Sequence, residues 1–524
     1  MTSTLHGVIL AAGIGSRLKP LTLERHKACV TVGDDPIVVH QLRAFAASPV
    51  DEVHVLTGYL SDQVAACCRD FADGRDDISV SVRECEVFAN TNNMYSLYEA
   101  RDAVAGEPFV LANGDVVFEP RALERLVESD ADSAIACDAS TYDEEAMKVT
   151  VDDDGRVDHI SKDVPESRAA ATSIDCYRFS AAFSATLFDE IVRRIEVDEA
   201  YDCWTEVAID GVLQSGRHDV RPVDVDGANW VEVDDHDDLL AADWTFSDFE
   251  DLRSKEAVFF DLDGTLYLDD ELVDGAADVV GALRASGTDV YFLSNNSSGW
   301  KTDYAEKLSR LGVPATPDQV VLSTDGVIEY LTENGTEDAY AVGTAAMRTA
   351  LSEAGVDPTA SDPEAVVVAF DTELSYEKVR EATLAVRDGA EFLLAHPDMV
   401  CPTADGLVPD CGSIGALVAA ATDREPSRVF GKPNAEMLAP VMDEHDLDPA
   451  DVAVVGDRLD TDVQMAANVG CESICVLSGD ASRVDVETHE LSPTLVVDSV
   501  GAFEYPDLTT SEESSASGTV QESS

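Results

Sequence analysis

Short apolar runs alternate with helical patterns along most of this chain. Each run is bounded by polar residues, as expected for a buried strand. Strands that alternate with helices predict an α/β fold built on parallel sheets. The predicted strands cover residues 7–12, 52–57, 108–112, 258–260, 289–294, 365–369 and 451–455.

Two interruptions of this alternation divide the chain. Residues 244–256 are polar, acidic and weakly periodic, which is typical of a connection between domains. A chain of 524 residues is too long for one core. The Ser- and Glu-rich residues 509–524 predict disorder. We therefore expect domains over 1–245 and 255–505, a linker over 246–254 and a disordered tail over 506–524.

The chain is strongly acidic, with 104 Asp and Glu residues against 35 Lys and Arg and a formal charge of −69. The acidic residues occur in both halves, a pattern that resembles proteins of salt-accumulating halophiles, where strong salt screens self-repulsion. An acidic protein of a mesophile is the alternative. We expect no binding to nucleic acid, because phosphate contacts need a basic face.

The eleven cysteines form no CxxC pair and no Cys/His zinc spacing, so we expect reduced thiols. No apolar run approaches the roughly 18 residues of a membrane span. The first residues lead into a predicted strand rather than a signal peptide. These features predict a cytoplasmic protein without membrane insertion.

Candidate chemistry begins where the first predicted strand ends. The run AAGIGSR, residues 11–17, has small side chains that let backbone N–H groups approach phosphate oxygens. Arg17 can clamp a triphosphate, and Lys27 offers a second cation. The run is not a dinucleotide fingerprint, because Leu18 stands at the position of the third glycine.

Carboxylates follow at two later strand positions. Asp115 comes directly after a strand, where an exposed carboxylate is a natural Mg²⁺ ligand. Glu232 and Asp234 lie at alternating positions of one predicted strand and face the same side, so one of them can complete a metal site with Asp115. An acidic surface turn is the alternative for this later segment.

The segments LAAGIGSRLKPLT and HKACVTV resemble the sugar-phosphate and choline-phosphate nucleotidyltransferases, and VFANTNNMYSLYEA resembles the LicC-type phosphocholine cytidylyltransferases. His26 precedes Lys27 where many sugar-nucleotide members have proline, which resembles the choline-type branch. The resemblance implies a Rossmann-like domain of the glycosyltransferase-A type. It also implies in-line attack of an acceptor phosphate on the α-phosphorus of an NTP, with release of pyrophosphate.

The same resemblance implies roles for single residues. Arg17 and Lys27 would act in catalysis by neutralising phosphate charge. Asp115 and Asp234 would hold Mg²⁺, with Glu232 as a further ligand. The nucleotide would contact Leu10, Ala11, Ala12, Gly13, Gly15, Arg17, Lys27 and Asn93.

Two interpretations remain open for each of four residues near the expected acceptor. Asn92 and Asn93 lie near the nucleotide or acceptor, or are plain turn residues. Trp204 and Trp230 form a cation–π cage for a quaternary ammonium, or are core or sugar-stacking residues.

Four segments of the second half have the residue types of a phosphate-transfer site. Each is a short apolar strand followed by a polar loop, so parallel strands would bring all four loops to one edge of a sheet. They contain Asp261 and Asp263, then Ser294 and Asn295, then Lys432, and last Asp457 and Asp462.

The chemistry assigns a role to each residue type. Asp261 is the candidate nucleophile on phosphorus, and Asp263 can protonate the leaving alkoxide and then activate water. Ser294 and Asn295 donate hydrogen bonds to phosphate, and Lys432 balances the carboxylates. Mg²⁺ would be held by Asp261, Asp457 and the backbone carbonyl of Asp263, with Asp462 supporting or touching the metal.

This ordered set resembles the haloacid dehalogenase (HAD) superfamily of phosphohydrolases across the whole half. The long insertion has a second α/β pattern and is similar to the large cap of the NagD-like branch, which we place at 336–426. Such a cap supplies specificity and excludes water. Asp398 and Asp410 of the cap are left unassigned, because an Asp in this chain is usually a surface charge.

The sequence therefore predicts a bifunctional enzyme with Mg²⁺ in both domains, whose ligands are an NTP, with CTP favoured, and small phosphorylated metabolites. Both halves would serve one pathway that makes an activated sugar, polyol or amino-alcohol phosphate. A catalytically inactive first domain that binds nucleotide and regulates the phosphatase is one alternative. Two unrelated housekeeping activities are the other.

Overall fold

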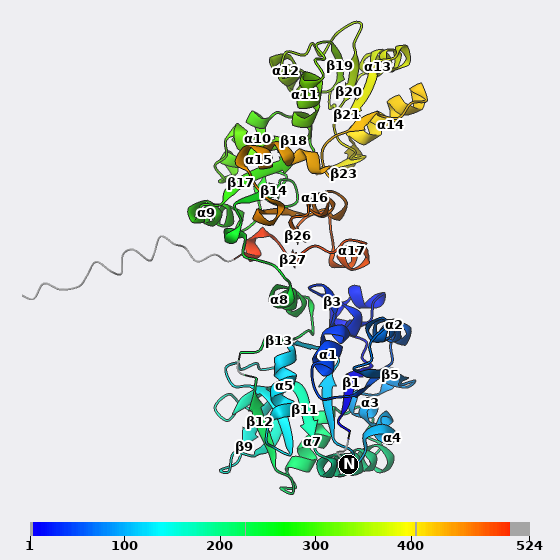
Figure 1. Cartoon of the computed structure of the whole chain (residues 1–524), viewed down its shortest axis with the longest axis vertical. Coiled ribbons are helices and arrows are strands. Elements are labelled where there is room, and N and C mark those ends of the chain that lie inside the picture. Colours follow the sequence, from blue (N-terminus) through cyan, green and yellow to red (C-terminus); the bar gives the residue numbers. More distant parts are fainter. Residues whose placement is uncertain (1–3, 226, 404–405, 504–524) are drawn as a thin grey trace, which may run out of the picture. The chain divides into compact units, whose positions relative to one another are not determined.

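The computed structural model describes residues 4–225, 227–403 and 406–503 and divides the chain into two units, Met1–Ser247 and Asp248–Ser524 (Figure 1). Its α/β architecture confirms the predicted fold class. The tail predicted over 506–524 lies outside the described residues. Among the helices of the described ranges, none combines the length and the apolar character needed to cross a membrane.

The first unit is built around a nine-stranded mixed sheet with the order β10-β9-β11-β6-β1-β4-β5, which β8 and β12 extend from β11. Its strands are β1 (His6–Ala11), β4 (Glu52–Thr57), β5 (Ser79–Glu84), β6 (Phe109–Asn113), β8 (Ser133–Asp138), β9 (Lys148–Val151), β10 (Val157–Ser161), β11 (Ala171–Phe179) and β12 (Val220–Asp224). Two further antiparallel pairs of short strands are separate from this sheet: the hairpin β2 (Thr31–Val32) with β3 (Asp35–Pro36), and β7 (Val116–Phe118) with the distant β13 (Trp230–Glu232).

The prediction of a parallel sheet is wrong for part of this unit. β1, β4, β5 and β6 are parallel, but β11 runs antiparallel to β6, β8 and β9. A tight turn reverses the chain between β9 and β10, where the Gly155 N–H donates to the Asp152 carbonyl at 2.9 Å. Apolar runs report that a strand is buried but not its direction, so the sequence pattern could not distinguish these strands.

Helices cover both faces of this sheet. Val8 and Leu10 of β1 belong to one core cluster, whereas Ile9 and Ala11 belong to the other. Both sides of β1 are therefore buried, which explains its continuous apolar run. The helices are α1 (Ile37–Ala46), α2 (Ser61–Ala72), α3 (Asn93–Glu99), α4 (Arg101–Val104), α5 (Pro120–Glu128), α6 (Ala181–Val192), α7 (Thr205–Leu213) and α8 (His236–Phe246).

The second unit has a parallel six-stranded core sheet with the order β18-β17-β14-β25-β26-β27. These strands are β14 (Ala257–Asp261), β17 (Asp289–Ser294), β18 (Val320–Leu322), β25 (Val452–Gly456), β26 (Glu472–Val476) and β27 (Leu495–Val497). The helices of this part are α9 (Ala276–Ser286), α10 (Lys301–Leu311), α11 (Ser323–Glu333), α15 (Ala439–His445), α16 (Gln464–Val469) and α17 (Arg483–Thr488).

An inserted lobe carries a second parallel sheet, β19-β20-β21-β24, and appears as the upper part of Figure 1. Its elements are β19 (Ala339–Val342), α12 (Ala345–Glu353), β20 (Ala365–Val368), α13 (Tyr376–Asp388), β21 (Glu391–Leu394), the hairpin β22 (Val400–Thr403) and β23 (Gly406–Pro409), α14 (Cys411–Thr422) and β24 (Arg428–Val429).

One strand assignment is corrected by this lobe. The short strand before Lys432, β24, pairs with β21 of the inserted sheet and not with a strand of the core sheet. Only three of the four predicted loops therefore follow core strands. A two-residue strand after a long insertion carries no sequence signal of the sheet that it joins.

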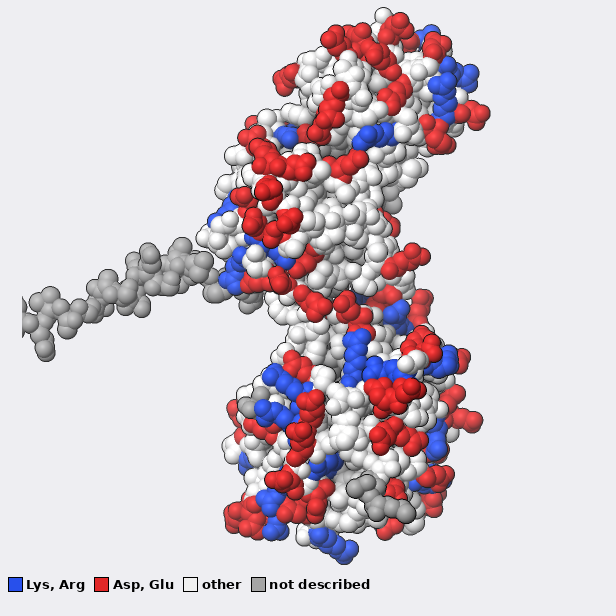
Figure 2. Space-filling view, viewed as in Figure 1, with Lys and Arg blue, Asp and Glu red and all other residues white. Residues whose placement is uncertain are grey.

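The border between the units lies inside the acidic region 244–256. Helix α8 continues to Phe246, so the first residues of that region are helical, and the first unit ends at Ser247. Acidic side chains are spread over both units on the face that Figure 2 shows.

Candidate active sites

The first candidate site is a cavity of about 260 Å³ where β1 and β6 end. These strands are parallel neighbours, so the loops that follow them meet at one edge of the sheet. Among the residues predicted for nucleotide and metal, ten line the cavity: Leu10, Ala11, Ala12, Gly13, Arg17, Lys27, Asn93, Asp115, Glu232 and Asp234.

Gly15 lies outside this lining and shapes the turn instead. Its φ is 64°, in the left-handed region, and a Cβ placed there would lie 2.9 Å from Cβ of Lys27. The Thr22 hydroxyl donates to the Gly15 carbonyl at 2.7 Å. A residue without a side chain is therefore needed here for Lys27 to pack against the turn.

Lys27 lies between two carboxylates. Its ammonium donates to Asp115 Oδ2 at 3.0 Å and to Asp234 Oδ1 at 2.9 Å, and Arg17 Nη2 donates to the other Asp234 oxygen at 2.6 Å. Burial alone would lower the pKa of Lys27, but the two carboxylates outweigh burial and the pKa is raised. Lys27 is therefore a permanent positive charge at the cavity.

His26 positions this lysine. Its Nδ1 accepts the Ala28 N–H at 2.9 Å and caps the short helix η3 (Lys27–Cys29), while its own backbone N–H donates to Gln63 at 2.8 Å. Burial lowers the pKa of His26 to about 4, so the ring is neutral and Nδ1 can accept. The sequence marked His26 only as a departure from a proline and missed this role.

Three carboxylates surround the same point. Asp115, Glu232 and Asp234 each present an oxygen atom, and these atoms lie within 4.8 Å of one another. Strand β13 pairs antiparallel with β7, and the Val233 N–H donates to the Asp115 carbonyl at 2.8 Å. This pairing joins two segments that are far apart in the sequence, and it creates an oxygen set that suits a hard dication.

The three carboxylates differ in charge. Burial raises the pKa of Glu232 to about 9, and the neighbouring Asp175 and Asp115 add to the effect. Burial acts on Asp234 in the same direction, but Lys27 and Arg17 outweigh it and lower the pKa of Asp234. A dication bound here would displace the proton from Glu232.

A buried polar cluster beyond these carboxylates was missed by the sequence reasoning. Tyr177 OH donates to Asp175 at 2.8 Å and lies 3.2 Å from Glu206 Oε1, and the Asn113 amide donates to Asp175 at 2.9 Å. Burial raises the pKa of Asp175 to about 6 and that of Glu206 to about 7. In so acidic a chain, two carboxylates carried no signal that distinguished them from surface charges.

The structure places the residues that had two interpretations in different surroundings. Asn93 Oδ1 accepts the Thr205 N–H at 2.8 Å and so holds the first turn of α7 against the cavity. Trp204 lines the cavity, with Nζ of Lys162 at 5.3 Å from its ring. Trp230 packs against the core and donates to Asp138 at 3.0 Å. The two tryptophans therefore do not form one cage.

The second candidate site lies where β14 and β25 end. Lys432 Nζ donates to Asp261 and, at 2.7 Å, to Asp462. Asp261, Asp457 and Asp462 present oxygen atoms that lie within 4.8 Å of one another. All four side chains are buried. Burial alone would lower the pKa of Lys432, but the adjacent carboxylates raise it.

The two carboxylate oxygens of Asp457 differ in their hydrogen bonding. Oδ2 accepts the Asp480 N–H at 2.7 Å, whereas the buried Oδ1 has no hydrogen-bond partner within the described ranges. Burial, together with Asp261 and Asp462, raises the pKa of Asp457 to about 8. A buried, unpaired carboxylate oxygen beside two further carboxylates fits a metal ligand.

Gly264 makes room for this carboxylate. Its φ is 87°, and an added Cβ would meet Oδ2 of Asp457 at 2.2 Å. The glycine of the DLDGT segment is therefore required by the close approach of a side chain from a different strand.

The predicted phosphate-binding loop is tied to Lys432. Asn295 Oδ1 accepts the Lys432 N–H at 2.7 Å, and Asn295 Nδ2 donates to the Lys432 carbonyl at 3.1 Å. Ser294 is buried next to it and accepts the Asn296 N–H at 3.0 Å. These two hydrogen bonds hold Lys432, which follows the last strand of the inserted sheet, beside Asp261, which ends a strand of the core sheet.

Asp263 stands apart from the carboxylate cluster. Its side chain is exposed, yet the surrounding protein raises its pKa against the opposing effect of Lys307 and Lys432. Its side chain is not part of the three-carboxylate group. This placement suits proton transfer better than metal binding.

The cap reaches this loop through residues that the sequence left unassigned. Asp398 accepts from the Asn295 amide at 3.2 Å and lies 3.6 Å from Arg458 Nη1. His396, fully buried, lies 3.6 Å from Asp410 and 3.1 Å from the Ser297 hydroxyl. Asp410 is therefore buried and Asp398 is largely covered, so neither is a free surface charge.

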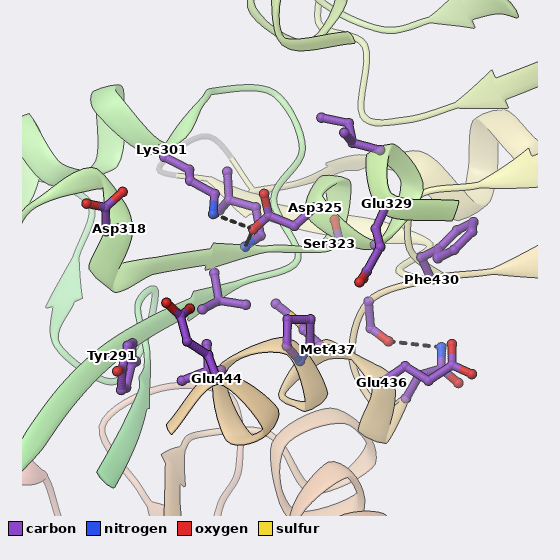
Figure 3. A pocket seen from close by; sticks show the side chains of 18 of the residues that line it. Tyr291, Lys301, Asp318, Ser323, Asp325, Glu329, Phe430, Glu436, Met437 and Glu444 are labelled. Carbon is purple, nitrogen blue, oxygen red and sulfur yellow. Dashed lines mark hydrogen bonds and ion pairs between the residues drawn. The ribbon is translucent and has the colours of Figure 1, made fainter. Parts of the chain in front are cut away.

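A large cavity of this unit lies away from this site. It has a volume of about 820 Å³ and contains the ion pair between Lys301 and Asp325, which Figure 3 shows. Ser323 and Gly431 on its wall border the back of the Asn295 loop, but none of the predicted catalytic carboxylates lines it. Size alone does not identify the reaction centre in this unit.

Comparison with known proteins identifies both halves. Residues 7–173 match the MobA-like NTP transferase domain, residues 258–357 the haloacid dehalogenase-like hydrolases and residues 429–503 the HAD-hydrolase-like family. Acid sugar phosphatases of Staphylococcus epidermidis and Staphylococcus aureus are 34% identical over 245 residues, which is 46% of this chain and 94% of the relative. A 4-nitrophenylphosphatase of Thermotoga maritima is 35% identical, with a TM-score of 0.47, over 48% of this chain and 96% of that chain.

The chain therefore belongs to the haloacid dehalogenase-like hydrolases through its second unit and carries a MobA-like NTP transferase domain in its first. It is an enzyme with a nucleotidyltransferase half and a phosphatase half, and the phosphatase half is similar to the acid sugar phosphatases over nearly their whole length. Both resemblances drawn from the sequence are confirmed at this level.

Proposed function

We propose that this bifunctional enzyme transfers a nucleotidyl group from an NTP, with CTP favoured, to a sugar, polyol or amino-alcohol phosphate, and hydrolyses a phosphate monoester at its second site. One observation carries the proposal. In each unit, a lysine bonded to two carboxylates lies beside a third carboxylate, at an edge of the sheet where parallel strands end. Such clusters balance phosphoryl charge.

Mg²⁺ is proposed for both sites. Asp115 and Asp234, with Glu232, would hold it in the first unit, and Asp261 and Asp457, with Asp462, in the second. When bound, Mg²⁺ supplies positive charge next to the phosphate oxygens and lowers the barrier to attack on phosphorus.

In the transferase half, the chain's own residues position the triphosphate. The small residues at the end of β1 leave room for its oxygens, and Arg17 and Lys27 offset their charge. An acceptor phosphate oxygen then attacks the α-phosphorus in line, and the bond to pyrophosphate breaks. The protein contributes orientation and charge, and no covalent intermediate is needed.

Other residues of the cavity lining indicate the acceptor. Asp175 and Glu206 are buried in its wall, and Trp204 lines the same space. Carboxylates and an aromatic face favour an acceptor whose non-phosphate end donates hydrogen bonds or carries an ammonium group. This supports polyol and amino-alcohol phosphates as first choices.

In the phosphatase half, Asp261 would attack phosphorus and form an aspartyl phosphate. Asp263 would give its proton to the leaving alkoxide and then take one from the water that hydrolyses the intermediate. Lys432 and Ser294 would hold the phosphate oxygens, and Asn295, whose side-chain amide is bonded to Lys432 and Asp398, would hold the lysine in place. Because relatives of this half are acid sugar phosphatases, sugar and polyol phosphates are the first substrates to test.

The cellular setting is part of the proposal. The acidic composition supports a cytoplasmic enzyme of a salt-rich interior, with small metabolites and not nucleic acid as ligands. The two activities would act in one pathway, in which the phosphatase removes a second phosphate from a precursor.

A substrate matrix tests the proposal. The purified full chain in high KCl receives CTP, UTP, GTP or dTTP with each member of a panel of phosphorylated sugars, polyols and amino alcohols. Pyrophosphate release with CTP and one acceptor class is expected. Nucleotide binding without turnover, together with a changed phosphatase rate, would instead identify the first unit as a regulatory domain.

A further inference from the structure

Two histidines and a glutamate meet at the opposite end of the first sheet from the nucleotide cavity. His6 opens β1, and Glu52 and His54 lie at the start of β4. In the parallel register His6 pairs with Glu52, and His54 follows two residues later on the same face. The register thus places three potential metal ligands side by side.

The contacts of the His54 ring suit a metal ligand. Its Nδ1 lies 2.8 Å from the Ser81 hydroxyl on β5, and that hydroxyl lies 3.4 Å from the Val53 carbonyl, which accepts its proton. With the hydroxyl proton on this carbonyl, Ser81 Oγ accepts from Nδ1, and the lone pair of Nε2 points toward Glu52. This is the tautomer that a metal ion on Nε2 requires.

The ring nitrogens of His6 and His54 that face Glu52 are available to bind a metal ion. His6 Nδ1 and His54 Nε2 are both buried and have no hydrogen-bond partner in the described part of the chain. They lie 3.6 Å and 3.9 Å from the two Glu52 oxygens, which is too far for a hydrogen bond. A dication with tetrahedral bonds of about 2.0–2.1 Å separates its ligand atoms by about 3.3–3.4 Å.

The spacing and the charge of these three side chains favour a bound cation. All three ligand atoms lie within 4.8 Å of one another. Two unpaired nitrogens beside a carboxylate are satisfied together by one cation.

We propose that His6, Glu52 and His54 bind one Zn²⁺ ion, with water in the fourth position. The ion would join the amino ends of β1 and β4, and Ser81 would hold His54 in the coordinating tautomer. Its role is structural, because the nucleotide cavity lies at the carboxyl ends of the same strands.

Metal binding to the full chain tests this site. Co²⁺ serves as the spectroscopic probe and Zn²⁺ as its competitor, with excess Mg²⁺ present to occupy the carboxylate clusters. We expect the visible absorption of tetrahedral Co²⁺ with one equivalent bound, and displacement by Zn²⁺. His54→Gln and Glu52→Gln should each abolish the signal, and Ser81→Ala should weaken affinity about 10–100-fold.

Two further variants separate this site from others. His159→Gln changes a two-residue pair, His159 with Asp210 at 2.6 Å, and should leave the signal unchanged. His396→Gln alters the cap cluster of His396, Asp398 and Asp410 and should also leave it unchanged. Absence of tetrahedral Co²⁺, or loss of the signal only with His396→Gln, would overturn the proposal. Should His54→Gln fail to fold, Glu52→Gln, at a half-exposed side chain, gives the same decision.

Discussion

The two candidate sites use the same arrangement at different depths. In each, a lysine ammonium donates to two carboxylates from distant parts of the chain. The partners of Lys27, Asp115 and Asp234, keep 31% and 18% of their side-chain surface exposed, whereas those of Lys432, Asp261 and Asp462, keep 9% and 1%. The first site is more accessible to solvent than the second.

This difference in depth has an energetic meaning. Solvent can replace a lost partner at the open site, but at the buried site an unpaired charge has nowhere to be hydrated. The lysine and its two carboxylates therefore serve mainly to position ligands in the first unit. In the second unit the same arrangement also belongs to the folded core. Variants of the two sites should separate in activity and in stability.

The largest expected effect is on phosphate release. Asp261→Asn removes the proposed nucleophile and should lower hydrolysis of nitrophenyl phosphate by about 10⁴–10⁶-fold while pyrophosphate release stays near the wild-type rate. The exposed Asp278→Asn on α9 is the matched control and should change neither rate. Loss of both activities in a folded Asp261→Asn protein would contradict two independent sites.

The reciprocal change is expected to be smaller. Asp115→Asn keeps the size of the side chain but removes a charge beside Lys27, and should lower nucleotidyl transfer by about 10²–10³-fold with hydrolysis retained. The two rates are measured on the same preparation in high KCl. An unchanged transfer rate would remove Asp115 from the proposed metal site.

Stability should distinguish the two lysines. Lys432→Met leaves two buried carboxylates without their cation and should destabilise the second unit by about 3–5 kcal/mol. Lys27→Met should cost the first unit about 1–3 kcal/mol, because its partners keep access to water. Hydrogen exchange of the full chain in urea reports on each unit separately. Equal losses would show that depth does not separate the sites.

The smallest effect concerns carboxylates that have no lysine partner. Asp175 and Glu206 have raised pKa values of about 6 and about 7 in the folded chain. A raised folded-state pKa gives stability that is complete below the ordinary value near 4 and is lost as the pH rises through about 7. We expect this pair to contribute a loss of roughly 1–3 kcal/mol between pH 4.5 and 7.5 in Mg²⁺-free buffer, in addition to the loss from Glu232, whose pKa is raised to about 9.

Two substitutions check the origin of this pH dependence. Glu206→Gln should make the dependence of stability on pH less steep, because it removes one titrating group and keeps the shape of the side chain. The exposed Glu124→Gln on α5 should leave the profile as it is. A profile that rises over this range would show that the pair remains ionised in the folded state.

Local sequence determined a large part of this protein. The strands around Glu52–Thr57 and Asp289–Ser294 were predicted with the bounds that the structure has. Asp261 and Ser294 end their strands and Asp457 directly follows a third, so their meeting at one sheet edge follows from the parallel direction of those strands. Polar loops after buried strands are local features, and a single sequence records them.

Only the tertiary structure decided which distant segments meet. Lys432 enters the phosphatase site from the inserted sheet, because β24 pairs with β21 after the chain has passed through the whole cap. Asp175 and Glu206 share one buried cluster only because β11 and α7 pack together, and His6 faces Glu52 only because β1 and β4 pair in one register. Strand order, register and direction arise from packing between segments that are remote in sequence, and no pattern within either segment encodes them.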